Sequence, residues 1–267
     1  DSANFSERYG EATQDNVIEF LAYDEQNPSS IISCLRAARE NARSIRETIS
    51  TSMWTQINSL YLHIQAHDSI PRPERLLDSF QEISLGCHLF QGITDATMSH
   101  NEAWQFLQLG RMLERADKTS RILDVKYFML LPSVHDVGTP YDDIHWAAVL
   151  KSVSGFQMYR KRFGRIAPDS VVDFLVMDRE FPRAILFCLS EANESLHKIT
   201  GTPLDSFRYR SEQLMGLLEG ELNFSSVEDI LCGGLHEYLD KLQDKMNNID
   251  SQLAVDFMNA VDQRQTA

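Results

Sequence analysis

Four arginines recur at spacings that place them on one side of a helix. They are Arg36, Arg39, Arg43 and Arg46. Each follows an apolar residue by one position, and one residue turns an α-helix by about 100°. In the helix expected over 28–50, the four guanidinium groups should therefore flank an apolar face. Planar, permanently charged donors in that position suit carboxylate or phosphate groups, so this stripe is a candidate surface for a substrate or partner.

The same arginines have acidic residues at the spacing of helical ion pairs. Arg36 stands four residues before Glu40, and Arg43 stands four residues before Glu47. Pairs at this spacing lie on neighbouring turns and attract one another. In this interpretation Glu40 and Glu47 are structural and the stripe is an ordinary charged face. Both interpretations stay open on the sequence alone.

A second charged cluster lies in the segment 110–124 and consists of Arg111, Glu114, Arg115, Asp117 and Arg121. Apolar residues surround it on several sides, which is typical of a central helix, and buried charges must be paired. Glu114 and Asp117 are therefore candidates for structural ion pairs, and the three arginines are candidates for contacts with a partner. Alternatively, Glu114 is the general base of an enzyme, with Arg115 or Arg121 holding a substrate carboxylate.

Metal and cofactor chemistry finds little support in the sequence. His63 and His67 stand one helical turn apart, but no glutamate follows in the pattern of a zinc protease. Glu194 and His197 resemble half of a di-iron site, yet the position 154 residues before His197 is Arg43, which cannot ligate a metal. There is no glycine-rich phosphate loop and no nucleophile elbow. We expect no cofactor and no metal.

The elements that carry these residues are expected to be helices throughout. Glycine and proline are sparse, at 12 and 8 residues in 267, and apolar residues recur every three or four positions. The segment 101–131 contains one glycine and no proline before Leu131, which predicts a single helix of about thirty residues. Thr13 and Pro168 have the chemistry of helix starts. The predicted fold class is all-α.

The sequence also repeats itself at a shift of 154 positions. The segment 5–41 matches 159–195 without a gap, with its apolar and proline positions in phase. This pattern predicts one domain over 1–267 built as a helical bundle from two tandemly duplicated units, about 1–100 and about 101–267. The counterpart of Glu114 would fall about 40 residues before Asp1 (114 − 154 = −40). We therefore expect the first unit to lack its N-terminal helix.

Charge and composition narrow the possible partners. The chain has 25 basic and 39 acidic residues, a net charge of −14, so nucleic acid and anionic membranes are poor partners. No apolar run approaches the length of a membrane span. The cysteines, Cys34, Cys87, Cys188 and Cys232, lack paired spacing, and we expect buried reduced thiols in a cytoplasmic protein.

Two sequence strings resemble a known family. They are Gly-Arg-Met-Leu-Glu-Arg-Ala-Asp at 110–117 and the arginine-rich segment 27–43. Together with the repeat, they resemble the bacterial alpha-E domain family, an all-helical family named for its Glu-Arg motif. The resemblance implies association with circularly permuted ATP-grasp ligases, transglutaminase-like proteins and peptidases in peptide synthesis or modification. It also implies a second Glu-Arg pair in the N-terminal helix that the repeat offset indicates is missing.

The leading functional hypothesis is a non-catalytic helical partner or scaffold in such a system. It would bind an ATP-grasp-type ligase, a transglutaminase-like protein or an acidic peptide through the arginine stripe. The alternative is an enzyme of that system in which Glu114 acts as general base.

Overall fold

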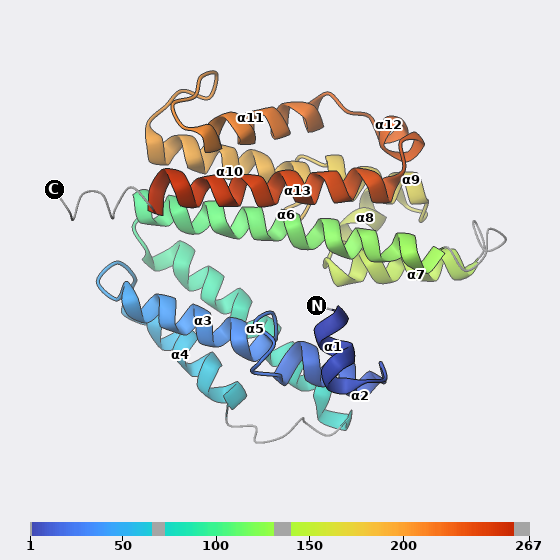
Figure 1. The fold of residues 1–267 in the computed structure, drawn as a ribbon, viewed down its shortest axis with the longest axis horizontal. Helices are drawn as coiled ribbons and strands as arrows, with labels where there is room; N and C mark the ends of the chain where they lie inside the picture. Colours follow the sequence, from blue (N-terminus) through green and yellow to red (C-terminus); the bar gives the residue numbers. More distant parts are fainter. Residues whose placement is uncertain (1, 66–72, 131–139, 259–267) are drawn as a thin grey trace. The chain divides into compact units, whose positions relative to one another are not determined.

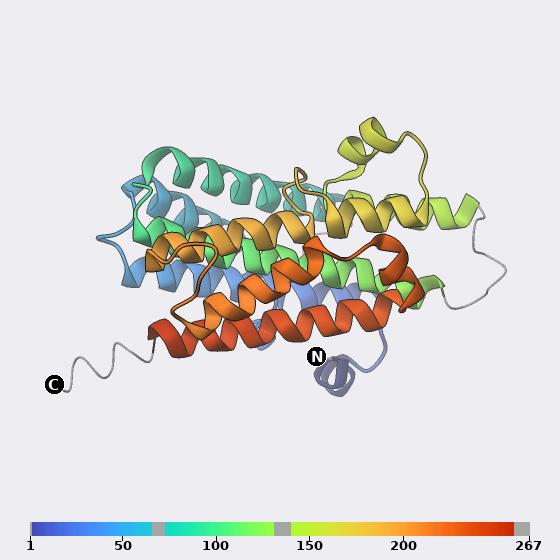
Figure 2. The same ribbon diagram turned by 90° about the horizontal axis from the view of Figure 1, so that it is seen from above.

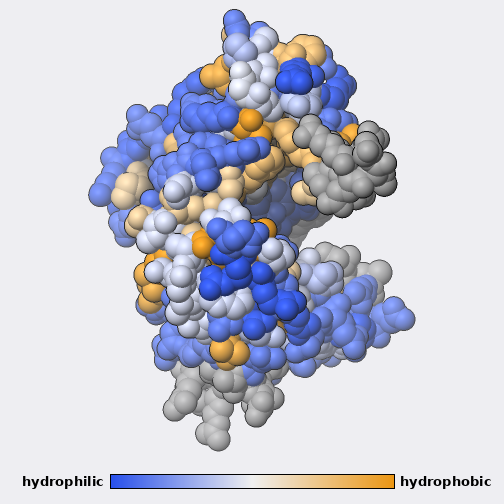
Figure 3. Space-filling view, turned by 90° about the vertical axis from the view of Figure 1, so that its left-hand side faces the viewer, coloured by the Kyte–Doolittle hydropathy of each residue, from blue (hydrophilic) through white to orange (hydrophobic). Residues whose placement is uncertain are grey.

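The computed structural model describes residues 2–65, 73–130 and 140–258, and every regular element in these ranges is helical (Figure 1). The chain divides into two compact units, residues 1–100 and residues 101–267. No described helix is long and apolar enough to cross a membrane. Figure 3 shows a face that is largely hydrophilic, with hydrophobic residues in small patches.

Unit 1 is built on three main helices. Its elements are α1 (Ser2–Tyr9), α2 (Gln14–Ile18), the π-turn η1 (Glu19–Tyr23), α3 (Ile31–Ser44), α4 (Thr51–Gln65) and α5 (Pro73–Thr97). Helix α4 packs against both α3 and α5. A small core of buried residues joins them, formed by Ile32, Leu35, Leu60, Tyr61, Ile64 and Ile83.

Unit 2 contains a larger bundle. Its elements are α6 (Glu102–Leu130), α7 (Pro140–Ser152), α8 (Phe156–Phe163), α9 (Pro168–Val172), the π-turn η3 (Asp173–Met177), α10 (Ile185–Thr200), α11 (Arg210–Asn223), α12 (Val227–Cys232), α13 (Leu235–Leu253) and the π-turn η4 (Ala254–Met258). Helices α6, α10, α11 and α13 run side by side (Figure 2). The predicted long helix is confirmed, because α6 has 29 residues.

Helix α10 is central to unit 2, and most of its residues are buried. It contacts α6 along most of its length and α11 on another side. Its residues Leu186, Leu189 and Leu196 are almost completely buried. Burial of each such side chain contributes about 1.5–3 kcal/mol to folding. This core fixes the positions of α6 and α13, which carry the main cavity.

Elements of the two units correspond at a shift of 154 residues. Adding 154 to the bounds of α1, α2 and η1 gives the bounds of α8, α9 and η3, and α3 and α10 begin at Ile31 and Ile185. The starts follow the predicted chemistry, since Thr13 caps α2 and Pro168 is the first residue of α9. The ion pair Arg8–Asp24 of unit 1 also recurs in unit 2 as Arg162–Asp178.

Two expectations, one about the helix over 28–50 and one about the cysteines, were wrong. The helix expected over 28–50 spans only Ile31–Ser44, so Arg46 lies in the following turn. The cysteines are free, but only Cys188 is buried, and Cys34, Cys87 and Cys232 are exposed. The difference in burial follows from the neighbours of each helix. Helix α10, which carries Cys188, is enclosed by α6 and α11, whereas α3, which carries Cys34, packs within unit 1 mainly on α4.

Candidate functional site

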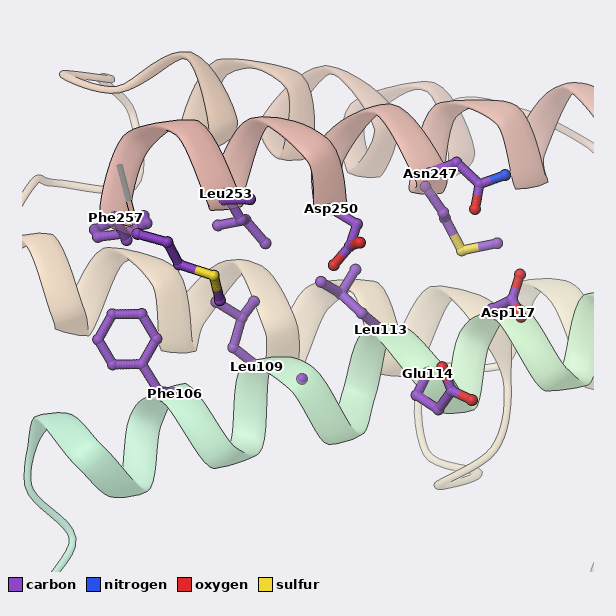
Figure 4. Close-up of a pocket in the computed structure, with 13 residues that line it drawn as sticks. Phe106, Leu109, Leu113, Glu114, Asp117, Asn247, Asp250, Leu253 and Phe257 are labelled. Carbon is purple, nitrogen blue, oxygen red and sulfur yellow. The ribbon is translucent and has the colours of Figure 1, made fainter. Parts of the chain in front are cut away.

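A cavity of about 570 Å³ lies in unit 2 between α6 and the α13–η4 segment (Figure 4). Its apolar lining includes Phe106, Leu109, Leu113, Met246, Leu253, Ala254, Phe257 and Met258. Its carboxylates are Glu114, Asp117 and Asp250. No basic residue is among the described residues that line it. The site therefore suits an apolar or cationic group better than an anion.

Helical spacing brings these residues together. On α6, Phe106, Gly110, Leu113 and Asp117 recur at three- and four-residue intervals and so share one face. Gly110 adds room, because no atom lies within 4 Å of the point where a Cβ would stand. On the opposite side, Met246, Asp250, Leu253 and Phe257 recur at the same intervals along α13 and η4. The sequence alone did not identify these residues as part of a site, although their spacing is that of one helix face.

Glu114 lies beside the cavity, as the enzyme hypothesis requires. Its side chain is 67% exposed, and Oε1 lies 3.1 Å from Lys118 Nζ one turn later. Arg121, a proposed holder of a substrate carboxylate, donates from Nε to Asp117 at 2.8 Å. Neither Arg121 nor Arg115 lines the cavity. The structure therefore does not combine Glu114 with a substrate-binding arginine.

Asp117 is the most enclosed carboxylate of the cavity, with its side chain 15% exposed. Burial opposes ionisation of this carboxyl, but the hydrogen bond from Arg121 and the charges of Arg121 and Lys118 outweigh it, so its pKa is lowered. Oδ1 has no hydrogen-bond partner among the described residues. Asp117 is therefore an ionised group with one oxygen left to accept a donor.

The neighbouring residues Glu114 and Arg115 point to different places. Arg115 Nη1 donates to the carbonyl of Pro182 at 3.0 Å, and Thr119 Oγ1 donates to the carbonyl of Arg183 at 2.8 Å. Both acceptors lie in the loop before α10. One residue is about 100° of helical rotation, so Glu114 reaches the cavity while Arg115 reaches α10. Arg115 thus fastens α6 to the start of α10. Arg111, one turn earlier, donates to Gln108.

The arginines of unit 1 contact different partners from those expected. We define the arginine cluster as Arg36, Arg39, Arg43 and Arg46. Arg36 lies 2.6 Å from Glu25, in the loop before α3. Arg39 and Arg43 both contact Glu40, at 2.8 and 2.7 Å. Glu47 makes no ion pair with the described part of the chain. The pairs Arg36–Glu40 and Arg43–Glu47 are therefore wrong.

Aromatic rings also order the arginine cluster. The guanidinium carbon of Arg39 lies 5.6 Å from the ring centre of Trp54 and 5.2 Å from that of Tyr61. The guanidinium carbon of Arg46 lies 5.0 Å from the ring centre of Trp54. Trp54 is thus shared by two cations. Such contacts fix the planes of the guanidinium groups.

The histidines weighed as metal ligands have other contacts. His63 Nε2 lies 2.9 Å from Glu82, while His67 falls outside the described residues. His197 Nδ1 lies 2.9 Å from the carbonyl of Thr202, and Glu194 pairs with Lys198. Across residues 2–65, 73–130 and 140–258, no three potential ligands are grouped as a metal site would require.

These helices define an all-α protein with a Glu-Arg pair on its longest helix. A family model described as a predicted alpha-helical domain with a conserved ER motif matches residues 1–258, and the chain belongs to this Alpha-E family. Uncharacterised proteins of Mycobacterium bovis and Mycobacterium tuberculosis are 21% identical over 231 residues, which is 83% of this chain. The chain spans about 25% of the length of these relatives. No solved structure matches it.

Proposed function

We propose that the chain is a non-catalytic helical binding module whose arginine cluster holds an acidic peptide or an acidic surface of a partner protein. One observation carries the proposal: Arg39 and Arg46 lie against aromatic rings, and within the described part of the chain the four guanidinium groups contact two carboxylates, those of Glu25 and Glu40. The four arginines and the two carboxylates that they contact together carry a formal charge of +2 (4 − 2), on a chain of net charge −14. Positive charge concentrated in this way selects an acidic partner.

The arrangement also lowers the cost of binding. Arg39 is only 27% exposed and is held by Trp54, Tyr61 and Asn58, to which its Nε donates at 2.7 Å. A guanidinium fixed before the partner arrives loses little further conformational entropy on binding. Arg43 is 68% exposed; its Nε and Nη2 contact Glu40, so Nη1 is the group that faces an incoming carboxylate.

The family resemblance indicates which partner to test. The resemblance connects alpha-E domains with ATP-grasp-type ligases and transglutaminase-like proteins in peptide synthesis or modification. In that setting the module would present an acidic peptide substrate, or the ligase itself, at the arginine cluster. The place of action in this proposal is the cytoplasm.

Within this proposal, the two units descend from one duplicated module. The shared element bounds at a shift of 154 residues support this, as does the recurrence of Arg8–Asp24 as Arg162–Asp178. The arginine cluster lies within unit 1, and the cavity between α6 and α13 lies within unit 2.

The test is a charge-matched pair of double variants. Arg43→Ala/Arg46→Ala removes two exposed members of the arginine cluster, and Arg165→Ala/Arg208→Ala removes two exposed arginines elsewhere. Binding of a fluorescent acidic peptide is measured by anisotropy at low salt, with circular dichroism as the check on folding. We expect the first variant to weaken binding about tenfold, since each exposed contact contributes up to about 1 kcal/mol. Equal effects of the two variants, or none, would refute the proposal.

A second candidate, an enzyme with Glu114 as general base, is supported by the cavity beside that residue. The test is turnover of the reconstituted peptide-modifying system with Glu114→Gln, compared with Glu191→Gln on an exposed face. Loss of turnover by at least about 100-fold with Glu114→Gln alone would establish the enzyme. Unchanged turnover would remove it.

A further inference from the structure

A second hollow of unit 2 lies between α11 and α13. Its volume is about 610 Å³, and its lining is mostly apolar, with Leu214, Leu217, Leu218 and Ile249 among the contributors. Phe224 stands at its edge and is 93% exposed, and Leu217 is 63% exposed. A ring so fully in water beside an apolar hollow is unusual for a surface without a partner.

Two glycines widen the same face of α11. Gly216 and Gly220 stand one turn apart inside the helix, and no atom lies within 4 Å of the point where a Cβ would stand at either position. Glycine inside a helix costs about 1 kcal/mol relative to alanine. No contact within the described chain requires a glycine at either position, so the loss of helix stability has no explanation within the chain. Close approach of a second helix, which needs a surface without side chains, would account for it.

We propose that this face binds the same face of a second copy of the chain. We define the α11 face by Arg210, Gly216, Leu217, Gly220, Glu221 and Phe224. A two-fold interface uses one patch twice, so the patch must be complementary to itself. The α11 face meets this condition in shape, because the exposed Leu217 stands beside the open surface left by Gly216 and Gly220.

The α11 face is also complementary to itself in charge. Arg210 and Phe224 are each seven residues from Leu217 (217 − 210 = 224 − 217), and Glu221 lies one turn before Phe224. When two α11 helices run antiparallel and cross at Leu217, Arg210 of one protomer faces the partner's Phe224 and the partner's Glu221. This arrangement provides a cation–π contact and an ion pair at each end.

The expected dimer is weak. Within the chain Glu221 already pairs with Lys245 across the hollow, so Arg210 adds a second cation to an occupied carboxylate. An interface made by one helix and its neighbour is also smaller than the ~1,600 Å² of a standard stable complex. We therefore expect a dissociation constant on the order of 10 μM.

The test uses two exposed phenylalanines of unit 2. Sedimentation equilibrium of the full chain should show a dimer whose population rises with concentration. Phe224→Asp should raise the dissociation constant at least about tenfold, because loss of an aromatic side chain buried in an interface commonly weakens binding by more than that factor. Phe207→Asp is the matched control, since Phe207 is 57% exposed and lies outside the α11 face. It should leave the dimer unchanged.

A charge exchange tests the antiparallel arrangement. Arg210→Glu should weaken the dimer, and the double variant Arg210→Glu/Glu221→Arg should restore it. A wild-type chain that stays monomeric at all concentrations would overturn the proposal. So would a dimer that is insensitive to Phe224→Asp, or a peptide-binding loss on Phe224→Asp without any dimer, which would assign the face to another partner.

Discussion

Arg162 pairs with Asp178, and the same pair recurs 154 residues earlier as Arg8 with Asp24. Asp178 is 6% exposed, and its Oδ1 accepts the backbone N–H groups of Glu180 and Phe181, both at 2.7 Å. One carboxylate thus links a short helix to the turn that precedes α10. In unit 1, Arg8 Nη2 donates to Asp24 at 2.9 Å, and Asp24 accepts the N–H of Gln26.

Asp178→Ala should lower the free energy of unfolding by about 2–4 kcal/mol, because it removes a buried carboxylate paired with the half-exposed Arg162 and leaves two backbone N–H groups without acceptors. Urea denaturation of the variant and of the exposed control Asp244→Ala measures the difference. Equal stability of the two variants would contradict a structural role for Asp178.

Glu212→Gln should destabilise the protein at neutral pH and lose this effect in acid. Glu212 is 1% exposed and accepts the N–H groups of Arg208 and Tyr209 at 2.6 and 2.8 Å. Burial opposes its ionisation, but these hydrogen bonds and that of Thr200 lower its pKa below the usual 4.5. A lowered folded-state pKa stabilises the fold above about pH 4.5, and the stabilisation disappears as pH falls through the folded value.

Urea denaturation of wild type and Glu212→Gln between pH 7 and pH 3 should therefore show a gap of about 1–3 kcal/mol that narrows below about pH 4.5. The exposed control Glu191→Gln should show no such gap. A gap that stays constant with pH would contradict ionisation as its cause.

Thr119→Val should weaken the attachment of α6 to α10. Thr119 is 2% exposed, and its hydroxyl satisfies the carbonyl of Arg183. Loss of that donor should cost about 1–2 kcal/mol of the free energy of unfolding. Acidic-peptide binding should stay unchanged, because the arginine cluster lies in unit 1. The control Ser251→Ala removes an exposed hydroxyl that bonds within its own helix, and a cost equal to that of Thr119→Val would contradict the prediction.

Two glycine substitutions should change the free energy of unfolding in opposite directions. Gly110→Ala adds a Cβ that meets no atom within 4 Å, so helix propensity should raise the free energy of unfolding by about 0.5–1 kcal/mol. Gly155→Ala places a Cβ 2.9 Å from the ring of Phe181 and 3.1 Å from that of Phe174, and should lower it by about 1–3 kcal/mol. Thermal unfolding of both variants measures the signs. A destabilised Gly110→Ala would mean that another group approaches Gly110.

Local features of the fold could be read from sequence because they depend on neighbouring residues. Thr13 accepts the N–H of Asn16 three positions later, and Pro168 starts its helix through its own fixed backbone angle. The length of α6 follows in the same way from a run without proline. The end of α3 was misjudged, since the apolar spacing continues past Ser44 while the helix does not.

The candidate site could be predicted only in part. Glu114 and Asp117 were identified from their charge, but Asp250 was not, because nothing near it in sequence connects it with α6. The choice of partner for Arg36 shows the same limit. Sequence spacing favoured Glu40, whereas the loop before α3 brings Glu25 to 2.6 Å.

The sequence by itself determined that the described chain is helical and where α2 and α9 begin, since each feature depends on residues within a few turns. Tertiary structure decided that Glu114 and Arg115, adjacent in sequence, act separately. One faces a cavity shared with α13, and the other bonds to Pro182, 67 positions away. Only packing of distant segments sets which neighbour lies on each side of a helix, so a pair of adjacent letters cannot reveal it.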